Sequence, residues 1–397
     1  MINNCNSLKL DKEKVLIRAD LNVPMKDGSV SDDFRIRKVL PTIHHCLDNG
    51  ASVILMSHLG RPEGKFNESL SLMPIGEVIC DYLERSIKFS NDCVSEDALD
   101  VSLGLQPGEV HLLENLRFHS EELENDSKFS QKLSKHGTCF INDAFGTAHR
   151  AHSSNVGVTE FFDKVSPGFL MEAEYKFLYE LMEVPERPLT IILGGAKIKS
   201  KLPLIKRFLN EADHLIIGGG MVFNILKAAG YNIGKSICDL DLIKASEEIL
   251  NLSNLNNNKL VIPTDFRVTK DLASGNVTAI RDFESIENDE IGIDIGPVSE
   301  ENFSSIIARS RTIVWNGPMG IFETPDFSKG TFSIAEAIAK RKIDGGISII
   351  GGGDSAAAVK TFKLEEEMTH ISTGGGASLE LLAGNELPAI KALRMIV

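Results

Sequence analysis

The chain of 397 residues lacks the features that would tie it to a membrane or to a nucleic acid. No apolar run approaches the ~18 residues that a membrane-spanning helix needs. The first residues, MINNCNSLKLDKEK, include no apolar stretch of the kind that a secretion signal carries. The net charge of −14 argues against general nucleic-acid binding, because an acidic surface repels phosphate backbones. We therefore predict a cytoplasmic protein that binds neither a membrane nor a nucleic acid.

Cysteine is sparse, and its spacing fits neither a disulfide framework nor a metal site. The chain contains no CxxC pair. The six cysteines are Cys5, Cys46, Cys80, Cys93, Cys139 and Cys238. We expect reduced thiols, as in most cytoplasmic proteins, and we expect Cys139 to be a small core residue within a strand.

Standard nucleotide-binding motifs are also missing. The absence of GxxxxGK[ST] excludes a P-loop enzyme, and His149-Arg150-Ala151 is not the HRD triplet of protein kinases. Gly351-x-Gly353-x-x-Ala356 fits the loose dinucleotide fingerprint, but the strand predicted after it does not end in an acidic residue. A nicotinamide-dependent dehydrogenase is therefore one alternative, and a non-catalytic scaffold of the same fold is another.

What the chain has is a repeated pattern, in which an apolar run ends in a glycine-rich or charged turn. Continuous apolar runs are typical of buried parallel strands, and their alternation with helix-length segments predicts an α/β fold with parallel sheets. In the first half we predict strands at 15–19, 52–57, 110–114 and 139–142. In the second half we predict strands at 190–193, 214–217, 259–262, 312–315, 347–350 and 369–372. The run IDIGP, at 293–297, has the same pattern.

The length suits two domains better than one core. Between the halves, apolar residues from Phe169 to Leu181 recur at helical spacing, and Pro167, Pro185 and Pro188 bracket them. This pattern predicts one helix that links two domains; the alternative is a surface helix of one large domain. The polar stretch 251–258 reads as a loop.

Cations in the first half follow the predicted strands. They stand in Arg18-Ala-Asp20-Leu-Asn22, His58-Leu-Gly-Arg61, Asn115-Leu-Arg117 and His149-Arg150, with Arg35 and Arg37 after the first turn. Arginine binds carboxylate and phosphate in a bidentate way, and the ends of parallel strands converge on one crevice. We predict an anion site there. The alternatives are separate surface charges and, for Asp20 and Asn22, a turn-stabilising pair before Pro24.

Glycine clusters follow the predicted strands of the second half, at 194–195, 218–220, 351–353 and 374–376. Such turns expose backbone N–H groups and helix N-termini to a phosphate, although each alone could be a tight turn. Lys197 and Lys201 are spaced to share a helical face. Asp354 is a hard oxygen ligand suited to Mg²⁺.

Taken together, these motifs resemble the phosphoglycerate kinase family, in family order and across nearly the whole chain. The matching stretches are RADLNVP (18–24), RIRKVLPTI (35–43), SHLGRP (57–62), ENLRF (114–118), NDAFGTAHRAH (142–152), GGAK (194–197), GGGM (218–221), DIGP (294–297), WNGPMGIFE (315–323), GGGDSAA (351–357) and STGGGASLELLAG (372–384).

The resemblance implies two Rossmann-like domains with parallel sheets facing a cleft. It divides the chain into a 3-phosphoglycerate-binding domain (1–168), a hinge helix (169–184), a nucleotide-binding domain (185–384) and a C-terminal segment that returns to the first domain (385–397). It implies a monomer that reversibly transfers a phosphoryl group between MgATP and the carboxylate of 3-phosphoglycerate, giving 1,3-bisphosphoglycerate and MgADP.

The resemblance also assigns roles to residues. Those implied to bind 3-phosphoglycerate are Asp20, Asn22, Arg35, His58, Leu59, Gly60, Arg61, Arg117 and Arg150. Those implied to bind ATP or ADP are Lys197, Lys201, Gly219, Asn316, Pro318, Glu323, Gly352, Gly353, Asp354 and Ser355, with Glu323 at the ribose and Asp354 as the Mg²⁺ contact. Those implied to face the transferred phosphoryl group are Arg35, Lys197, Gly374, Gly375 and Gly376. The chain departs from the family pattern at Ala19, often Val, at Ala173, often Lys, and at Ser200, often Asp.

Overall fold

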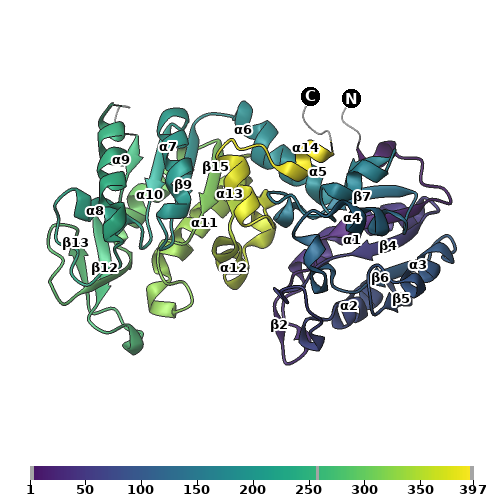
Figure 1. Cartoon of the computed structure of the whole chain (residues 1–397). Helices are drawn as coiled ribbons and strands as arrows, with labels where there is room; N and C mark the ends of the chain where they lie inside the picture. Colours follow the sequence, from purple (N-terminus) through teal and green to yellow (C-terminus); the bar gives the residue numbers. More distant parts are fainter. Residues whose placement is uncertain (1–3, 256–258, 394–397) are drawn as a thin grey trace. The chain divides into compact units, whose positions relative to one another are not determined.

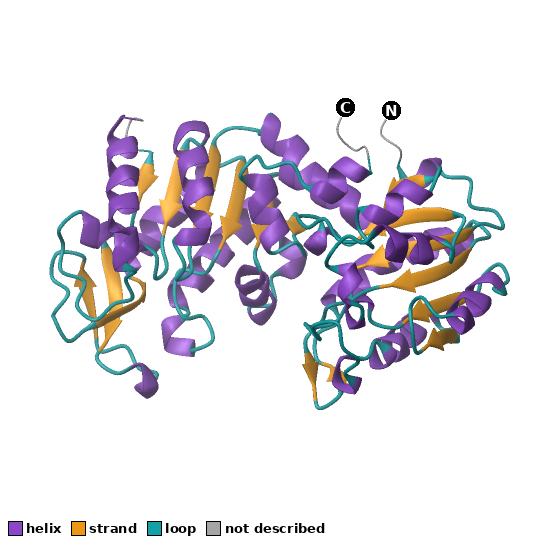
Figure 2. Cartoon of the chain, in the orientation of Figure 1, coloured by secondary structure: helices purple, strands orange, loops and turns teal. Residues whose placement is uncertain are grey.

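The computed structural model describes residues 4–255 and 259–393, and these form two compact α/β units (Figure 1). Unit 1 comprises Met1–Lys176 together with Asn385–Val397, and unit 2 comprises Phe177–Gly384. In each unit, helices cover the faces of a central sheet (Figure 2). Across the described residues, every helix is too short or too polar to span a membrane.

The sheet of unit 1 has six parallel strands in the order β5-β6-β4-β1-β7-β8. The strands are β1 (Lys14–Ala19), β4 (Ser52–Met56), β5 (Ile87–Ser90), β6 (Val110–Leu113), β7 (Cys139–Asp143) and β8 (Val165–Pro167). All four predicted strands are present within one residue of their predicted ends. The edge strands β5 and β8, and the small hairpin of β2 (Met25–Lys26) and β3 (Ser29–Val30), were not predicted. They are short or partly exposed, so they lack the continuous apolar run of a central strand.

Helices on both sides complete unit 1. They are α1 (Phe34–Asp48), α2 (Met73–Leu83), α3 (Glu96–Leu103), α4 (Ser127–Ser134), α5 (Phe169–Tyr175) and α14 (Pro388–Ala392). Helix α14 belongs to unit 1 although it follows all of unit 2 in sequence. The Ala389 N–H donates to the Ala148 carbonyl at 3.1 Å, and Leu387, Ile390 and Leu393 are buried. Residues 394–397 of the predicted C-terminal segment lie outside the described residues.

Unit 2 contains a six-stranded parallel sheet in the order β11-β10-β9-β15-β16-β17. The strands are β9 (Leu189–Leu193), β10 (His214–Ile217), β11 (Leu260–Val261), β15 (Thr312–Asn316), β16 (Ile347–Gly351) and β17 (His370–Ile371). Every strand predicted for this half is present, with β11 and β17 shorter than predicted. The six cysteines of the chain are free thiols, and Cys139 is buried in β7 as expected.

A second, antiparallel sheet of unit 2 corrects the sequence analysis. It has the order β13-β12-β14, in which β12 is Asp265–Thr269, β13 is Ala279–Asp282 and β14 is Ile291–Ile295. The run IDIGP therefore ends the antiparallel strand β14 and is not a parallel strand of the main sheet. Its last three strand residues are buried like those of a parallel strand, so the apolar run alone could not reveal the strand direction.

The helices of unit 2 are α6 (Leu181–Glu183), α7 (Leu202–Glu211), α8 (Val222–Ala228), α9 (Ile243–Leu255), α10 (Pro297–Arg309), α11 (Lys329–Ile343), α12 (Gly353–Thr361) and α13 (Gly376–Leu382). Helix α9 continues to Leu255, so the predicted loop at 251–258 is wrong for its first five residues; 256–258 lie outside the described residues. Ile249 and Ser253 are buried on one face of α9, and this packing outweighs the low helix propensity of asparagine.

The segment predicted as one linking helix is helical but not uniform. Helix α5 passes into a π-helical stretch, Lys176–Glu180, and then into α6. The boundary between the two units falls between Lys176 and Phe177, inside the π-helical stretch. Spacing of apolar residues cannot distinguish a π-turn from an α-turn over so short a length.

Candidate functional site

In unit 1, the loops after β1 and β4 are fastened to each other at the carboxyl end of the sheet. The Ser57 hydroxyl donates to the Ala19 carbonyl at 2.7 Å and accepts from the Leu21 N–H at 2.9 Å. The Asn22 side-chain oxygen accepts from the Gly60 N–H at 2.9 Å. These bonds fix the two loops that carry Asn22 and the predicted residues from His58 to Arg61.

Arg35, at the start of α1, is held over this edge by the buried carboxylate of Asp20. Its guanidinium donates to Asp20 Oδ2 at 2.9 Å and to the Asn22 carbonyl at 3.2 Å. The Arg35 side chain is 29% exposed, whereas that of Asp20 is 3% exposed. Asp20 thus positions a cation that solvent, or a ligand, can reach.

Positive charge beside these loops comes from Arg61, Arg117 and Arg150. Arg117 donates to the Gly60 carbonyl at 2.7 Å. Burial, together with repulsion from Arg18 and Arg150, lowers the pKa of Arg117 to about 10, which leaves it cationic at neutral pH. Arg61 is exposed and makes no hydrogen bond or ion pair with any described residue, so its charge is available to a ligand.

Arg18 lies deeper than the anion-site prediction assumed. Its fully buried guanidinium donates to Ser154 Oγ at 2.7 Å and to the Ala19 carbonyl, and it lies 3.1 Å from His58 Nδ1. The buried Glu122 carboxylate accepts two bonds from Ser154 and attracts Arg18. Arg18 is therefore a buried residue that holds the site in place and is not itself exposed to a ligand. Its counter-charge is Glu122, which the sequence analysis missed.

The remaining cationic candidates of unit 1 differ in role. Burial and the neighbouring arginines lower the pKa of His58 well below its ordinary value and that of His152 to about 4, so both are neutral at pH 7. Arg150 donates to His149 Nε2 at 3.1 Å. Arg37 is exposed and paired with Asp33 at 3.0 Å, and among the described residues no hydrogen bond or ion pair joins it to the fastened loops. The predicted anion site thus includes neutral donors as well as charges, and it does not include Arg37.

In unit 2, a cavity of about 340 Å³ lies at the carboxyl end of the parallel sheet. Four residues of the predicted nucleotide set line it: Gly219, Pro318, Glu323 and Asp354. Its apolar lining, which the sequence analysis missed, comes from the side of the antiparallel sheet and includes Phe223, Ile237, Phe266, Leu272 and Ile321. A cavity with apolar walls and a few polar groups is typical of a small-molecule site.

Glycine is required where the loops of this cavity approach each other. A Cβ atom at Gly219 would lie 2.4 Å from the Gly195 nitrogen and 2.7 Å from the Pro318 carbonyl oxygen, and Gly219 has a φ of +63°. The Gly195 N–H donates to the Pro318 carbonyl at 2.7 Å. The glycine pattern therefore reflects close backbone packing around the cavity as well as turn geometry.

The two lysines that were predicted to share a helical face differ in burial. Lys201 is buried, and its ammonium donates to the Asn316 carbonyl at 2.7 Å and to the Gly194 carbonyl, which joins the ends of β9 and β15. Burial lowers the pKa of Lys201 to about 8, against the attraction of Asp354. Lys197 lies before the short helical turn Lys199–Lys201 and is exposed. Its side chain forms no hydrogen bond or ion pair with a described residue. The Ser200 hydroxyl donates to the Lys197 carbonyl at 3.1 Å.

Polar groups near the start of α12 are left for a ligand. Asn316 is buried, and its side-chain Nδ2 has no hydrogen-bond partner. Asp354, in the first turn of α12, is exposed and forms no hydrogen bond or ion pair with a described residue. Ser355 instead accepts the Gly317 N–H at 2.6 Å and so holds the loop after β15. At the start of α13, the Gly374 N–H already donates to Ser372 Oγ at 3.1 Å.

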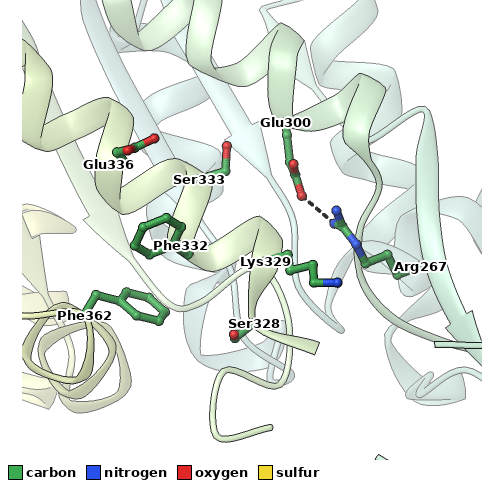
Figure 3. A pocket seen from close by; sticks show the side chains of 8 residues that line it. All are labelled: Arg267, Glu300, Ser328, Lys329, Phe332, Ser333, Glu336 and Phe362. Atoms are coloured by element: carbon green, nitrogen blue, oxygen red, sulfur yellow. Dashed lines mark hydrogen bonds and ion pairs between the residues drawn. The ribbon is translucent and has the colours of Figure 1, made fainter. Parts of the chain in front are cut away.

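Asp294 is a further residue of this cavity that the sequence analysis did not select. It is buried and accepts the Gly330 N–H at 2.6 Å, and burial raises its pKa to about 8. A second cavity, of about 510 Å³, lies near it, with the Arg267–Glu300 pair on one side and the rings of Phe332 and Phe362 on the other (Figure 3). Arg267 also lies 3.7 Å from Asp294. No residue predicted for the nucleotide site lines this second cavity.

Two α/β units, one with an arginine cluster and one with a glycine-rich, partly apolar cavity at their strand ends, are the architecture of a two-substrate α/β kinase. Comparisons with known proteins give the particular family. The sequence profile described as phosphoglycerate kinase matches residues 5–385, so the chain belongs to the phosphoglycerate kinase family. The family transfers a phosphoryl group between ATP and 3-phosphoglycerate in glycolysis, and the chain is accordingly a phosphotransferase.

Relatives and solved structures agree with this assignment over nearly the whole length. The chain is 47% identical to a phosphoglycerate kinase of Dictyoglomus turgidum over 385 residues, covering 97% of this chain and 96% of the relative. It is 45% identical to one of Chloroherpeton thalassium over 381 residues, with 96% of each covered. The solved phosphoglycerate kinase of Coxiella burnetii superposes with a TM-score of 0.89 at 37% identity, covering 100% of this chain and 99% of that one.

Proposed function

We propose that unit 1 binds 3-phosphoglycerate at the fastened loops after β1 and β4, and that unit 2 binds ATP or ADP in the 340 Å³ cavity. The contrast in available groups supports this division. Unit 1 offers guanidinium groups, which suit a small phosphate and carboxylate. Unit 2 offers an apolar lining for a base, the free amide of Asn316 and helix N-termini for phosphates.

Each side chain then has a proposed role, supported by its contacts or by the family resemblance. In unit 1, Arg61, Arg117 and Arg150 supply charge for the phosphoglycerate, while Asp20 and Asn22 hold Arg35 and Gly60 in place and His58 acts as a neutral donor. Leu59 and Gly60 offer backbone near the ligand. In unit 2, Gly219, Pro318, Gly352 and Gly353 shape the nucleotide site, Glu323 binds the ribose, and Lys201 and Ser355 hold the surrounding loops.

The residues around Asp354 fit a magnesium ion bound together with nucleotide phosphates. A carboxylate without a protein partner, at the edge of a cavity, is the kind of single protein ligand that Mg²⁺ usually takes beside phosphates and water. When bound, Mg²⁺ neutralises charge on the phosphate oxygens. Removal of divalent ions with a chelator is expected to abolish turnover, and Asp354→Asn to raise the Mg²⁺ concentration needed for half-maximal rate.

The chemical step needs charge neutralisation rather than a base. The attacking carboxylate of 3-phosphoglycerate is already ionised near pH 7, which agrees with the neutral state of His58 and His152. Arg35 from unit 1, with Lys197 and the amides of Gly375 and Gly376 from unit 2, stabilises the charge on the transferred phosphoryl group, whereas the Gly374 N–H is bound to Ser372 Oγ. Because the substrates bind to different units, transfer requires closure of the units, with residues 169–184 as the hinge, and closure also excludes water.

A coupled assay tests the proposal directly. Purified protein receives 3-phosphoglycerate and MgATP, and added glyceraldehyde-3-phosphate dehydrogenase reports the product through NADH consumption. We expect Mg²⁺-dependent turnover well above 1 s⁻¹, within the usual range for enzymes. ATP binding without turnover would instead favour the scaffold alternative. Size-exclusion chromatography and cell fractionation test the further proposals that the protein is a monomer and lies in the cytoplasm.

A further inference from the structure

Three metal-ligating side chains with no part in the proposed reaction lie together in unit 1. Asp92 and Cys93 follow the edge strand β5, and His119 follows the short helical turn Leu116–Phe118. The carboxylate oxygen, the thiol sulfur and the imidazole nitrogen lie within 4.8 Å of one another. Sequence spacing gave no sign of this cluster, because His119 lies 26 positions after Cys93.

Two of the three donor atoms are already spaced as ligands of one ion. Asp92 Oδ1 accepts the backbone N–H groups of Val94 at 2.6 Å and Ser95 at 2.8 Å. This fixes the carboxylate, whose Oδ2 lies 3.2 Å from His119 Nε2. Ligands bound tetrahedrally at about 2.0–2.2 Å from a zinc ion are about 3.3–3.6 Å apart, so an ion would fit between them with only a small movement.

Cys93 supplies a sulfur for which no other side chain competes. The residue is fully buried, and among the described residues its thiol has a hydrogen bond only with its own backbone. Its carbonyl accepts from His136 Nε2 at 3.1 Å. His136 Nδ1 lies 2.7 Å from Ser102 Oγ, which in turn lies 2.8 Å from His111 Nδ1. This buried chain fixes the Cys93 backbone, as supporting hydrogen bonds do around metal ligands.

We propose that Asp92, Cys93 and His119 bind one divalent transition-metal ion, of which Zn²⁺ is the best match. One oxygen, one sulfur and one nitrogen donor suit a borderline-soft ion and not Mg²⁺ or Ca²⁺, which prefer oxygen alone. Binding forms a metal–sulfur bond and releases the thiol proton to solvent. It also replaces the hydrogen bond between Asp92 and His119, and the Nε2 proton of His119 moves to Nδ1 through solvent. Side-chain exposures of 38% for Asp92 and 26% for His119 give the ion a path from solvent and leave room for water as the fourth ligand.

Cobalt titration of the full chain, freed of metal by chelation, tests this site. Co²⁺ takes the same geometry as Zn²⁺, and a thiolate ligand adds a near-ultraviolet sulfur-to-cobalt charge-transfer band. We expect that band to saturate at one ion per chain and to disappear on addition of Zn²⁺. Cys93→Ser and His119→Gln should each lose it. Cys80→Ser, a matched change on α2, should keep it, and so should Asp354→Asn.

Several results would overturn the proposal. One is the absence of a charge-transfer band in the parent protein; another is a band that persists in Cys93→Ser. If circular dichroism shows that Cys93→Ser does not fold, His119→Gln decides, because an unchanged band and affinity there would exclude the cluster. The readout is independent of kinase activity, so failure of this site leaves the assignment of the substrate sites untouched.

Discussion

At the ends of their parallel sheets the two units carry different kinds of groups for the anions that we propose they bind. Unit 1 carries charged side chains. Arg117 stays cationic despite burial, and the buried Glu122 carboxylate offsets the charge of Arg18. Unit 2 instead exposes backbone groups. Gly195 and Gly219 allow loops to approach within contact distance, and the buried ammonium of Lys201 joins two strand ends.

The difference follows from the sizes of the ligands that we assign to the two units. A small, highly charged molecule gives little surface to bury, so fixed charges must supply the affinity. A nucleotide offers a base and a ribose as well as phosphates, so an apolar lining such as Phe223 and Phe266 can contribute, and phosphates can be left to N–H groups. Substitutions that act on one ligand and spare the other test this contrast.

The largest effect is expected where both units must contribute charge to the same phosphoryl group. Lys197→Ala should lower kcat by roughly 10²-fold or more, the scale of losing one transition-state donor. Arg35→Ala should do the same from the other unit. Single-turnover and steady-state rates measure this. Lys199→Ala, an equally exposed change two residues away, is the control; a parent-like kcat for Lys197→Ala would refute its role.

A change of one glycine should weaken nucleotide binding selectively. Gly219→Ala places a methyl group 2.4 Å from the Gly195 nitrogen at a φ of +63°. We expect the KM for ATP to rise at least about tenfold, the KM for 3-phosphoglycerate to stay constant, and stability to fall by about 1–3 kcal/mol. Thermal unfolding of Gly353→Ala, where the added methyl meets nothing within 4 Å, controls for stability. Equal shifts in both KM values would contradict the division of sites.

The converse change acts on unit 1. Arg61→Ala should raise the KM for 3-phosphoglycerate about tenfold, the equivalent of one hydrogen bond to a charged group, with kcat and the KM for ATP nearly unchanged. Arg37→Ala removes an equally exposed arginine that pairs with Asp33, so it should leave both constants unchanged. A KM effect confined to ATP would show that the substrates are assigned to the wrong units.

The smallest effect is a pH dependence that separates the units. The pKa of Lys201 is lowered to about 8, so its charge is lost as the pH rises through that value, whereas Arg117, with a pKa of about 10, stays charged. ATP affinity should fall a few-fold between about pH 7.5 and 9, and 3-phosphoglycerate affinity should not. Calorimetric titrations at each pH measure both. In Lys201→Arg the ATP slope should flatten; parallel slopes for the two ligands would count against the argument.

Much of the fold could be predicted because buried parallel strands are continuous apolar runs. The runs at β1, β4, β9 and β16 end in polar or glycine turns, and those turns carry most of the residues we assign to the sites. The predictable part is therefore local, since strand and turn stand next to each other in sequence. The resulting fold agrees with that of the solved phosphoglycerate kinase of Coxiella burnetii, with a TM-score of 0.89.

The remaining features depend on partners distant in sequence. Arg18 could not be recognised as a buried support, because its counter-charge Glu122 is more than a hundred residues away. Nor could Asp294 be recognised as part of a cavity, because the antiparallel sheet that carries it was not predicted. A separation of 27 positions likewise conceals the pairing of His119 with Asp92. Burial, and not residue type, decides what each of these groups does.

The return of the chain to unit 1 after Gly384 has a consequence for how the protein is made. Helix α14, whose Ala389 bonds to Ala148, leaves the ribosome after every residue of unit 2. Unit 1 begins to emerge first and is completed last. During synthesis, the loop that contains Ala148 is therefore not yet packed against α14 when all the strands of unit 2 have been made. In a chain that ends before Asn385, unit 2 should therefore resist proteolysis better than unit 1.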